Sequence, residues 1–339
     1  MKRGFVMKVR GWSILFIIFF LGLFVPLTGC NRELHPNNIA TDDPSTYPNR
    51  SISLIVPFSA GGGTDLIARA LAKASEKHLG QPITVVNRIG GSGSLGLLEG
   101  SSAKEDGYTV TMLVTELSTL PHLGLLPINY KNFKPILMIN ADPAAITVRA
   151  DSQWKTITQL LDYTRLNPDQ VKMGNAGTGS VWHLAASTVE KAAKVKFNHI
   201  PFEGAAPAIS ALLSGHIDAL PVSAAEVKAN PGAQDLHVLT ILNEKPSVSF
   251  PDVKTIGQET GLDFNYFHAW RGIGAPKDTP DDIVKVLEDA FNKGIKEKKF
   301  KEFMEYNGFS VFVKNHSEFG QHLKGQHIIL DNQIPELLP

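Results

Sequence analysis

Cysteine is almost absent from this sequence of 339 residues, and Cys30 is the only one. A disulfide framework within the chain and a metal or cluster site built on several thiolates are therefore excluded. The histidines show no paired spacing of the kind found in metal-binding motifs. We expect neither a metal ion nor any other cofactor.

An excess of charge of either sign is also missing. The chain has 33 basic and 33 acidic residues, and its formal net charge is zero. A protein that binds nucleic acid usually shows a basic patch or stripe, so we expect no nucleic-acid partner. The 43% hydrophobic and 19% charged residues are typical of a globular protein, and the length allows two domains.

Long apolar runs occur only at the N-terminus. Four basic residues precede the run from Trp12 to Val25, which is short for a membrane span but typical of a secretory signal. The run is followed by Leu27-Thr28-Gly29-Cys30, which resembles the bacterial lipobox, whose cysteine is diacylated and becomes the first residue after cleavage. The alternative is an ordinary signal peptide with a chance cysteine.

The segment after Cys30 has a composition typical of a flexible tether. Residues 30–49 are rich in Asn, Pro, Asp and Thr and have few apolar side chains. We therefore expect a signal peptide over 1–29, lipidation at Cys30, and a body held by its lipid on the extracytoplasmic face of the cell membrane. Cleavage would leave a formal net charge of −4 on the mature chain.

The body alternates short β-like runs with helical patterns, which predicts an α/β fold with parallel sheet and helices on its faces. The pattern restarts near residue 150 and indicates two lobes that face a cleft. The predicted strands are 52–56, 83–86, 108–114, 144–149, 171–173, 198–201 and 217–222. The predicted helices are 64–80, 94–103, 156–167, 180–194, 207–213 and 280–297.

A glycine-rich loop follows the first predicted strand. Its candidate ligand-binding residues are Phe58, Ser59, Gly61, Gly62, Gly63, Thr64 and Asp65. Free N–H groups at the start of the following helix could hold an anion. The loop lacks the lysine of a Walker motif and the usual G-x-G-x-x-G spacing. Its local pattern fits a simple turn with helix caps equally well.

A second loop of this kind ends the strand at 171–173. Its candidate ligand-binding residues are Asn175, Thr178, Gly179, Ser180 and the nearby His183. Two such loops, one in each predicted lobe, could direct N–H and hydroxyl donors at one carboxylate. His183 could instead act as a base beside Ser180, or simply pack on its helix and bond a neighbouring loop. No G-x-S-x-G elbow supports a hydrolase.

Six motifs in this order resemble the substrate-binding proteins of tripartite tricarboxylate transporters, the TctC or Bug family. They are VPFSAGGGTDLIAR (56–69), VVNRIGGSGSLG (85–96), DGYTVTM (106–112), GNAGTGSVWHLAA (174–186), HIPFEGAAPAISALLSGHIDA (199–219) and WRGIGAPKDTP (270–280). The resemblance covers roughly residues 47–339. It implies a periplasmic-binding-protein-like fold with lobe 1 at 50–148 and 270–339, and lobe 2 at 149–269.

The same resemblance implies a function. Such a protein is a monomeric receptor, not an enzyme, that closes on a small organic acid or amino acid and delivers it to the membrane permease of a tripartite tricarboxylate transporter. In the family the two glycine-rich loops pinch a carboxylate. An alternative output is presentation of the solute to a membrane sensor kinase, and a hydrolase using Ser180 and His183 is a third possibility.

Glu116 departs from the family pattern. Many relatives have a small polar run at this point, where this chain has Thr115-Glu116-Leu117-Ser118. The side chain sits where strand ends line a cleft, so it faces either the ligand or solvent. At the ligand, an acid would disfavour a polyanion such as citrate and favour a solute with a donor or cationic group, such as an amino acid.

Overall fold

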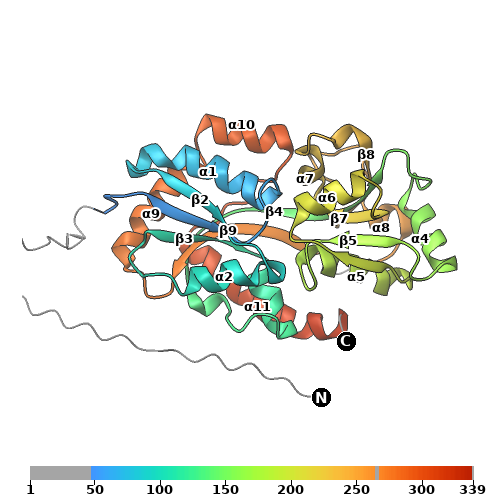
Figure 1. The fold of residues 1–339 in the computed structure, drawn as a ribbon, viewed down its shortest axis with the longest axis horizontal. Coiled ribbons are helices and arrows are strands. Elements are labelled where there is room, and N and C mark those ends of the chain that lie inside the picture. Colours follow the sequence, from blue (N-terminus) through green and yellow to red (C-terminus); the bar gives the residue numbers. More distant parts are fainter. Residues whose placement is uncertain (1–46, 264–266, 338–339) are drawn as a thin grey trace, which may run out of the picture. The chain divides into compact units, whose positions relative to one another are not determined.

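The computed structural model describes residues 47–263 and 267–337 (Figure 1). The predicted signal peptide, Cys30 and most of the predicted tether lie outside these residues. The last three tether positions are described, and the Tyr47 hydroxyl donates a hydrogen bond to the Gly107 carbonyl at 2.8 Å. The body thus begins with Tyr47 attached to the turn before its third strand.

The first lobe is built on three parallel strands, as the sequence predicts. β1 (Ile52–Val56) lies between β2 (Ile83–Asn87) and β3 (Thr109–Val114). Its helices include α1 (Gly63–Leu79), α2 (Ser94–Ser101), α9 (Asp281–Gly294) and α10 (Lys298–Asn307). The core is made of large side chains from strand and helix alike, such as Leu54, Leu71 and Phe291.

The second lobe repeats this plan. β5 (Lys172–Asn175) pairs in parallel with β6 (Asn198–Pro201) and β7 (Ala219–Val222). Its helices include α4 (Ile157–Leu166), α5 (Val181–Ala193), α6 (Ala205–Leu213), α7 (Ala224–Lys228) and α8 (Ile256–Thr260). A separate core that contains Met173, Leu184 and Ile209 fills this lobe. Two cores on the two halves of one nine-stranded sheet confirm the predicted two-lobe α/β fold.

Two long strands run between the lobes. β4 (Phe133–Arg149) pairs antiparallel with β9 (His268–Pro276) as far as Pro143, and from Ala144 onward with β7 and with β8 (Leu236–Leu242). The predicted strand at 144–149 is the last part of β4, and the rest of β4, β8 and β9 are not among the predicted strands. β4 and β9 pair antiparallel because they lead the chain between the lobes in opposite directions. The predicted boundaries at 148/149 and 269/270 stay predictions.

Several helix ends differ from the prediction: α2 ends at Ser101 and α6 begins at Ala205, against predicted ends at 103 and 207. The helix expected over 280–297 ends at Gly294, and a new helix begins at Lys298 because Glu297 has an extended backbone with φ −62° and ψ 138°. Pro280 is the residue before this helix and not its first residue. The predicted start after Thr156 is confirmed, since the Thr156 hydroxyl accepts from the Gln159 N–H.

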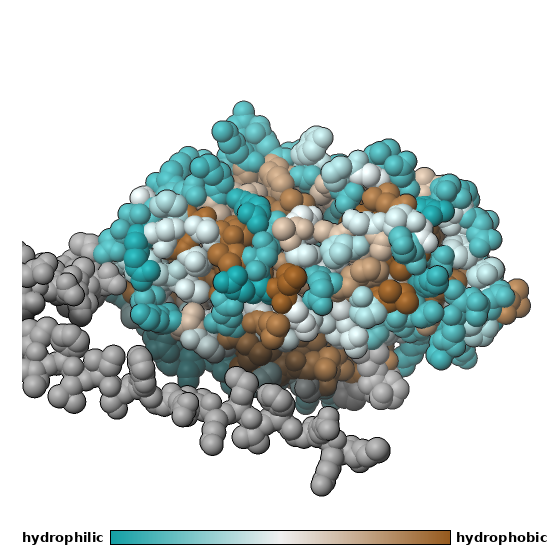
Figure 2. Space-filling view, viewed as in Figure 1, coloured by the Kyte–Doolittle hydropathy of each residue, from teal (hydrophilic) through white to brown (hydrophobic). Residues whose placement is uncertain are grey.

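α11 (His316–Leu337) ends the described chain, and its Ile328 and Ile329 are exposed. Figure 2 shows mostly hydrophilic surface over both lobes, with hydrophobic side chains gathered at the lower edge where Figure 1 draws this helix. Among residues 47–263 and 267–337, no helix has both the length and the apolar character needed to cross a membrane.

Candidate functional site

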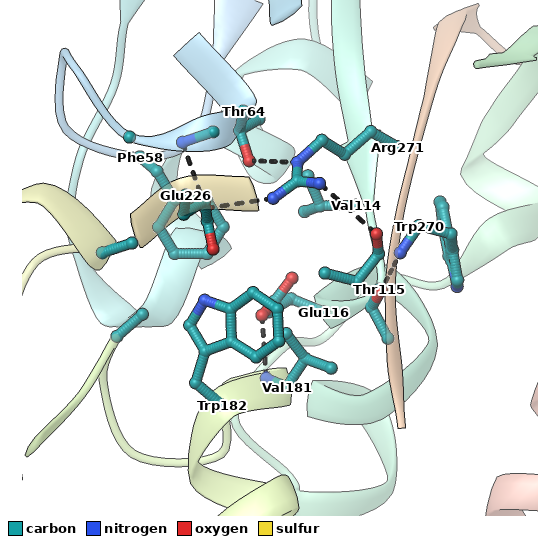
Figure 3. Close-up of a pocket in the computed structure, with 15 residues that line it drawn as sticks. Phe58, Thr64, Val114, Thr115, Glu116, Val181, Trp182, Glu226, Trp270 and Arg271 are labelled. Carbon is teal, nitrogen blue, oxygen red and sulfur yellow. Dashed lines mark hydrogen bonds and ion pairs between the residues drawn. The ribbon is translucent and has the colours of Figure 1, made fainter. Parts of the chain in front are cut away.

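A pocket lies where both glycine-rich loops meet the two long strands (Figure 3). It is lined by residues from both lobes and from β9. The lining residues are Phe58, Gly62, Gly63, Thr64, Val114, Thr115, Glu116, Ala176, Val181, Trp182, Ala205, Glu226, Ala269, Trp270 and Arg271. The open space among them is about 20 Å³, which is room for about one water molecule.

Glu226 reaches from the second lobe to the first. It stands on α7, and its Oε1 accepts hydrogen bonds from the Gly63 N–H and from Arg271 Nη2, both at 3.1 Å. Gly63 is the first residue of α1, so the carboxylate lies at the positive end of that helix. The side chain is 3% exposed, and burial raises its pKa while Arg271 opposes that effect.

Arg271 joins Glu226 to the floor of the pocket. Its Nη1 lies 2.9 Å from Asp142 Oδ2, and its Nε donates to the Thr64 hydroxyl at 3.0 Å. The arginine is 2% exposed and stands on β9, while Asp142 stands on the neighbouring β4. One buried cation therefore serves two buried acids and holds the first turn of α1.

Glu116 makes the reverse connection, from the first lobe to the second. It begins the short helix α3 (Glu116–Thr119) directly after β3, and its Oε1 accepts from the Val181 N–H at 2.9 Å. Val181 is the first residue of α5. The carboxyl group is 2% exposed, and burial raises its pKa to about 7.

Other contacts between the lobes show that the cleft is closed. The Ser92 hydroxyl donates to the Thr178 carbonyl at 2.7 Å, and the Ser59 N–H donates to the Glu203 carbonyl at 3.3 Å. Only glycine fits at position 177, because φ is +109° and a Cβ there would lie 2.4 Å from Ser92 Oγ.

Aromatic rings form much of the remaining wall. Phe58 follows β1, Trp182 is the second residue of α5, and Trp270 precedes Arg271 on β9. Figure 3 draws Trp182 beneath Glu226 and beside Glu116. Both tryptophans are buried, and the Trp270 indole nitrogen has no hydrogen-bond partner among the described residues.

The first predicted loop supplies four of the lining residues, namely Phe58, Gly62, Gly63 and Thr64. Asp65 is turned away: its carboxylate accepts from the Gly61 N–H at 2.9 Å and pairs with Arg69. Burial raises the pKa of Asp65, but the bonds from Arg69, Gly61 and Asn87 outweigh it, and the pKa falls below its usual value. The Ser59 hydroxyl is buried without a partner in the described chain.

The second predicted loop contributes Ala176 to the pocket wall and is otherwise largely bonded to itself. The Asn175 side chain accepts from the Gly177 N–H, and the Ser180 hydroxyl accepts from the His183 N–H as the cap of α5. His183 Nδ1 accepts from the Gly179 N–H at 3.1 Å. Burial lowers the pKa of His183 to about 4, so the ring is neutral at pH 7.

Thr178 lines a neighbouring hollow with Gly91, Ser92 and Gly177. Of the predicted ligand-binding residues, five therefore line the pocket: Phe58, Gly62, Gly63, Thr64 and Glu116. The role of each predicted residue in binding stays a prediction.

Glu226 and Arg271 are not among the residues predicted from the sequence. Glu226 forms a capping box with Ser223, and this helix-capping role is enough to account for an acid at this position. Arg271 interrupts an apolar strand, and a charge inside such a run is the signal that could have identified it. Across the described residues, no group of three or more His, Cys, Asp or Glu side chains could hold a metal ion.

Comparison with known proteins decides the family. The model described as "Tripartite tricarboxylate transporter family receptor" matches residues 67–331. This chain belongs to that family. Among the receptor's relatives, the protein encoded between tcbD and tcbE in Pseudomonas sp. strain P51 is 32% identical over 74% of this chain and 75% of its own length. Protein BugT of Bordetella pertussis is 28% identical over 86% and 88%.

Solved structures of related receptors agree with this family assignment. A ligand-free TctC solute-binding protein from Polaromonas is 42% identical over 86% of this chain and all of its own, with a TM-score of 0.62. MatC from Rhodopseudomonas palustris, with bound malate, is 25% identical over 85% and all of its own chain, with a TM-score of 0.78. The structure of this receptor is thus closer to the malate-bound relative than to the ligand-free one, although the sequence is not.

Proposed function

We propose that this receptor captures a small carboxylated metabolite outside the cytoplasm and delivers it to the membrane permease of a tripartite tricarboxylate transporter. One observation carries the proposal: the starts of two helices, α1 from one lobe and α5 from the other, line the same buried pocket. Helix N-termini attract anions, and a carboxylate can accept bonds from both sides at once.

The donors for such a carboxylate are present on both walls. Among the described residues, no hydrogen bond to a protein acceptor uses the Thr64 or Trp182 N–H. The Gly63 N–H and Arg271 bond Glu226, so a solute carboxylate would replace Glu226 at these two donors. The malate-bound relative supports a solute of this class.

Capture works through closure of the lobes. Solute enters while the lobes are apart, and closure buries it between α1 and α5. A ligand favours the closed form only to the extent that it binds that form more tightly than the open one. The permease then distinguishes loaded from empty receptor by the relative position of the lobes.

Binding without turnover fits the roles of Ser180 and His183. The Ser180 hydroxyl caps α5, and the imidazole accepts from the Gly179 N–H. Both groups hold the second loop in place, which supports a receptor that binds its solute without turnover. We further propose that a lipid on Cys30 keeps the receptor at the extracytoplasmic face of the membrane.

Calorimetric titration of the purified receptor with mono- and dicarboxylic acids, malate included, tests the binding function. The expected result is saturable binding of at least one acid and no change in its chemical structure after prolonged incubation. A panel without any binder would refute the proposal. Uptake of the bound acid should then fail when the permease genes are deleted, whereas continued uptake would contradict delivery to that permease.

A further inference from the structure

The charges around the pocket do not balance. Asp142, Glu226 and Glu116 are buried with a single cation, Arg271. Arg271 is paired with Asp142 at 2.9 Å and with Glu226 at 3.1 Å. Glu116 forms no ion pair within the described chain, and its partner is the neutral Val181 N–H. The four side chains carry a surplus of negative charge when they are ionised.

The surplus lies at one end of the pocket. Figure 3 draws Arg271 and Thr64 at one side, and Glu116 at the other, beside Trp182. An isolated buried carboxylate is costly, because its hydration is lost without a counter-ion. Burial raises the pKa of Glu116 accordingly; the Val181 hydrogen bond and the charge of Arg271 oppose this effect only in part, and the charge of Glu226 adds to it. A cation brought by the solute would remove this cost.

The wall next to Glu116 is suited to a cation as well. Phe58, Trp182 and Trp270 line the pocket together with the two glutamates. The face of an aromatic ring attracts ammonium groups, and tryptophan does so most strongly. A carboxylate and an indole side by side therefore offer an ammonium group both an ion pair and a ring face.

We propose that Glu116 and Trp182 bind the ammonium group of the solute, so that this receptor takes an amino carboxylic acid in preference to the corresponding plain acid. The inference rests on the proposed function, because the solute carboxylate is assigned to the donors of Gly63, Thr64 and Arg271 and to the backbone N–H of Trp182, while the ammonium group contacts the Glu116 carboxylate and the Trp182 ring. The acid in the pocket then acts as a selector: a second carboxylate placed near Glu116 is repelled, and an ammonium group is attracted.

Matched pairs of acids that differ only in the amino group provide the test. We would titrate the receptor at pH 8 with alanine and propionate, leucine and 4-methylpentanoate, aspartate and succinate, and glutamate and glutarate. At least one amino acid should bind ten times or more as tightly as its plain partner. In Glu116→Gln this ratio should fall close to one, while Glu105→Gln, an exposed change in the same lobe, should leave it unchanged.

The outcomes separate the two proposals. Equal affinity within every pair that binds, or a ratio that survives in Glu116→Gln, overturns the ammonium site and leaves the carboxylate receptor intact. Binding of no acid at all overturns both. If Glu116→Gln does not fold, Trp182→Leu takes its place: the preference for the amino acid should drop severalfold, and Trp182→Phe should retain most of it.

Discussion

The N–H of Gly63 donates a hydrogen bond to the carboxylate of Glu226 across the cleft, although 163 positions separate the two residues. Glu116 and the Val181 N–H repeat the relationship in the opposite direction. Each lobe thus places an acid at the first turn of a helix in the other lobe. These bonds are charge-assisted and buried, which makes them stronger than ordinary surface contacts.

Arg271, Asp142 and Glu226 should contribute to stability in a coupled, non-additive way. Replacing Arg271 with Met leaves Asp142 and Glu226 buried without a cation and should cost about 3–5 kcal/mol of unfolding free energy. Adding Glu226→Gln should recover about 1–3 kcal/mol, because one of the two unpaired charges is removed. Urea unfolding of both variants measures this.

Arg88→Met is the control for the Arg271→Met and Glu226→Gln variants. Arg88 pairs with Glu99 on the surface, and both side chains are about half exposed. This control variant should cost less than about 1 kcal/mol. Strictly additive effects of Arg271→Met and Glu226→Gln would contradict the coupling.

Gly63→Ala should weaken solute binding by filling the space of the solute carboxylate. A Cβ at this position would lie 2.9 Å from Arg271 Nη2 and 2.6 Å from Glu226 Oε1, the place at which the solute carboxylate would replace Glu226. We expect a loss of affinity of about tenfold or more, equivalent to about 1.4 kcal/mol. Titration with the tightest ligand measures the loss.

Gly325→Ala is the matched control, because a Cβ there meets nothing within 4 Å. It lies within α11 and should leave affinity unchanged while stabilising the helix by about 0.5–1 kcal/mol. Unaltered affinity in Gly63→Ala would contradict binding of the solute carboxylate at this place.

Glu116 should make stability depend on pH. Burial raises its pKa to about 7 in the folded protein, and the pKa of an unfolded glutamate is about 4.3. The folded state therefore holds the proton more tightly. The contribution of this group is fully present below the unfolded pKa and is lost as pH rises through about 7.

The difference between Glu116→Gln and the unaltered protein isolates this effect, because Arg271 and Glu226, which face Glu116, are present in both. Relative to the unaltered protein, the variant should gain stability between pH 5 and pH 8. Urea unfolding at four pH values in this range gives the curve. A difference that stays flat across it would refute the assignment.

Cys30→Ser should release the receptor from the membrane. The thiol of Cys30 is the proposed site of the lipid, and the chain has no other cysteine to replace it. Labelling cells with a radioactive fatty acid and separating membrane from soluble fractions should show loss of label and a shift to the soluble fraction. Unchanged membrane association of the variant would contradict lipid anchoring at this residue.

The parallel parts of the fold were predictable because each element has a local pattern. β1 matches its prediction at both ends, since an apolar run stops at Pro57. The part of β4 that pairs with β9 contains Pro135, Asn140 and Pro143, which break the sequence pattern of a strand. The paired residues of β9 lie 125 or more positions further along the chain, since Pro143 pairs with His268 (268 − 143 = 125). Only the folded protein therefore shows why this part of β4 is extended.

The site was predictable only where the sequence marks it locally. Three consecutive glycines identify the first loop, and a strand end identifies Glu116. Glu226 and Arg271 are 45 positions apart, and no local pattern indicates that they pair. The hydrogen bond from the Gly63 N–H to the Glu226 carboxylate was likewise not predictable from any local pattern.

The Glu226 contact makes the protein a competitor of its own solute. The Glu226 carboxylate occupies the Gly63 N–H and Arg271, two donors that an external carboxylate needs, so a solute gains only the difference between its bonds and those of Glu226. The apparent affinity is the intrinsic affinity multiplied by the fraction of receptor in which those donors are free. A receptor built in this way needs a higher concentration of any carboxylate, so weak mimics of its solute stay unbound at low concentration.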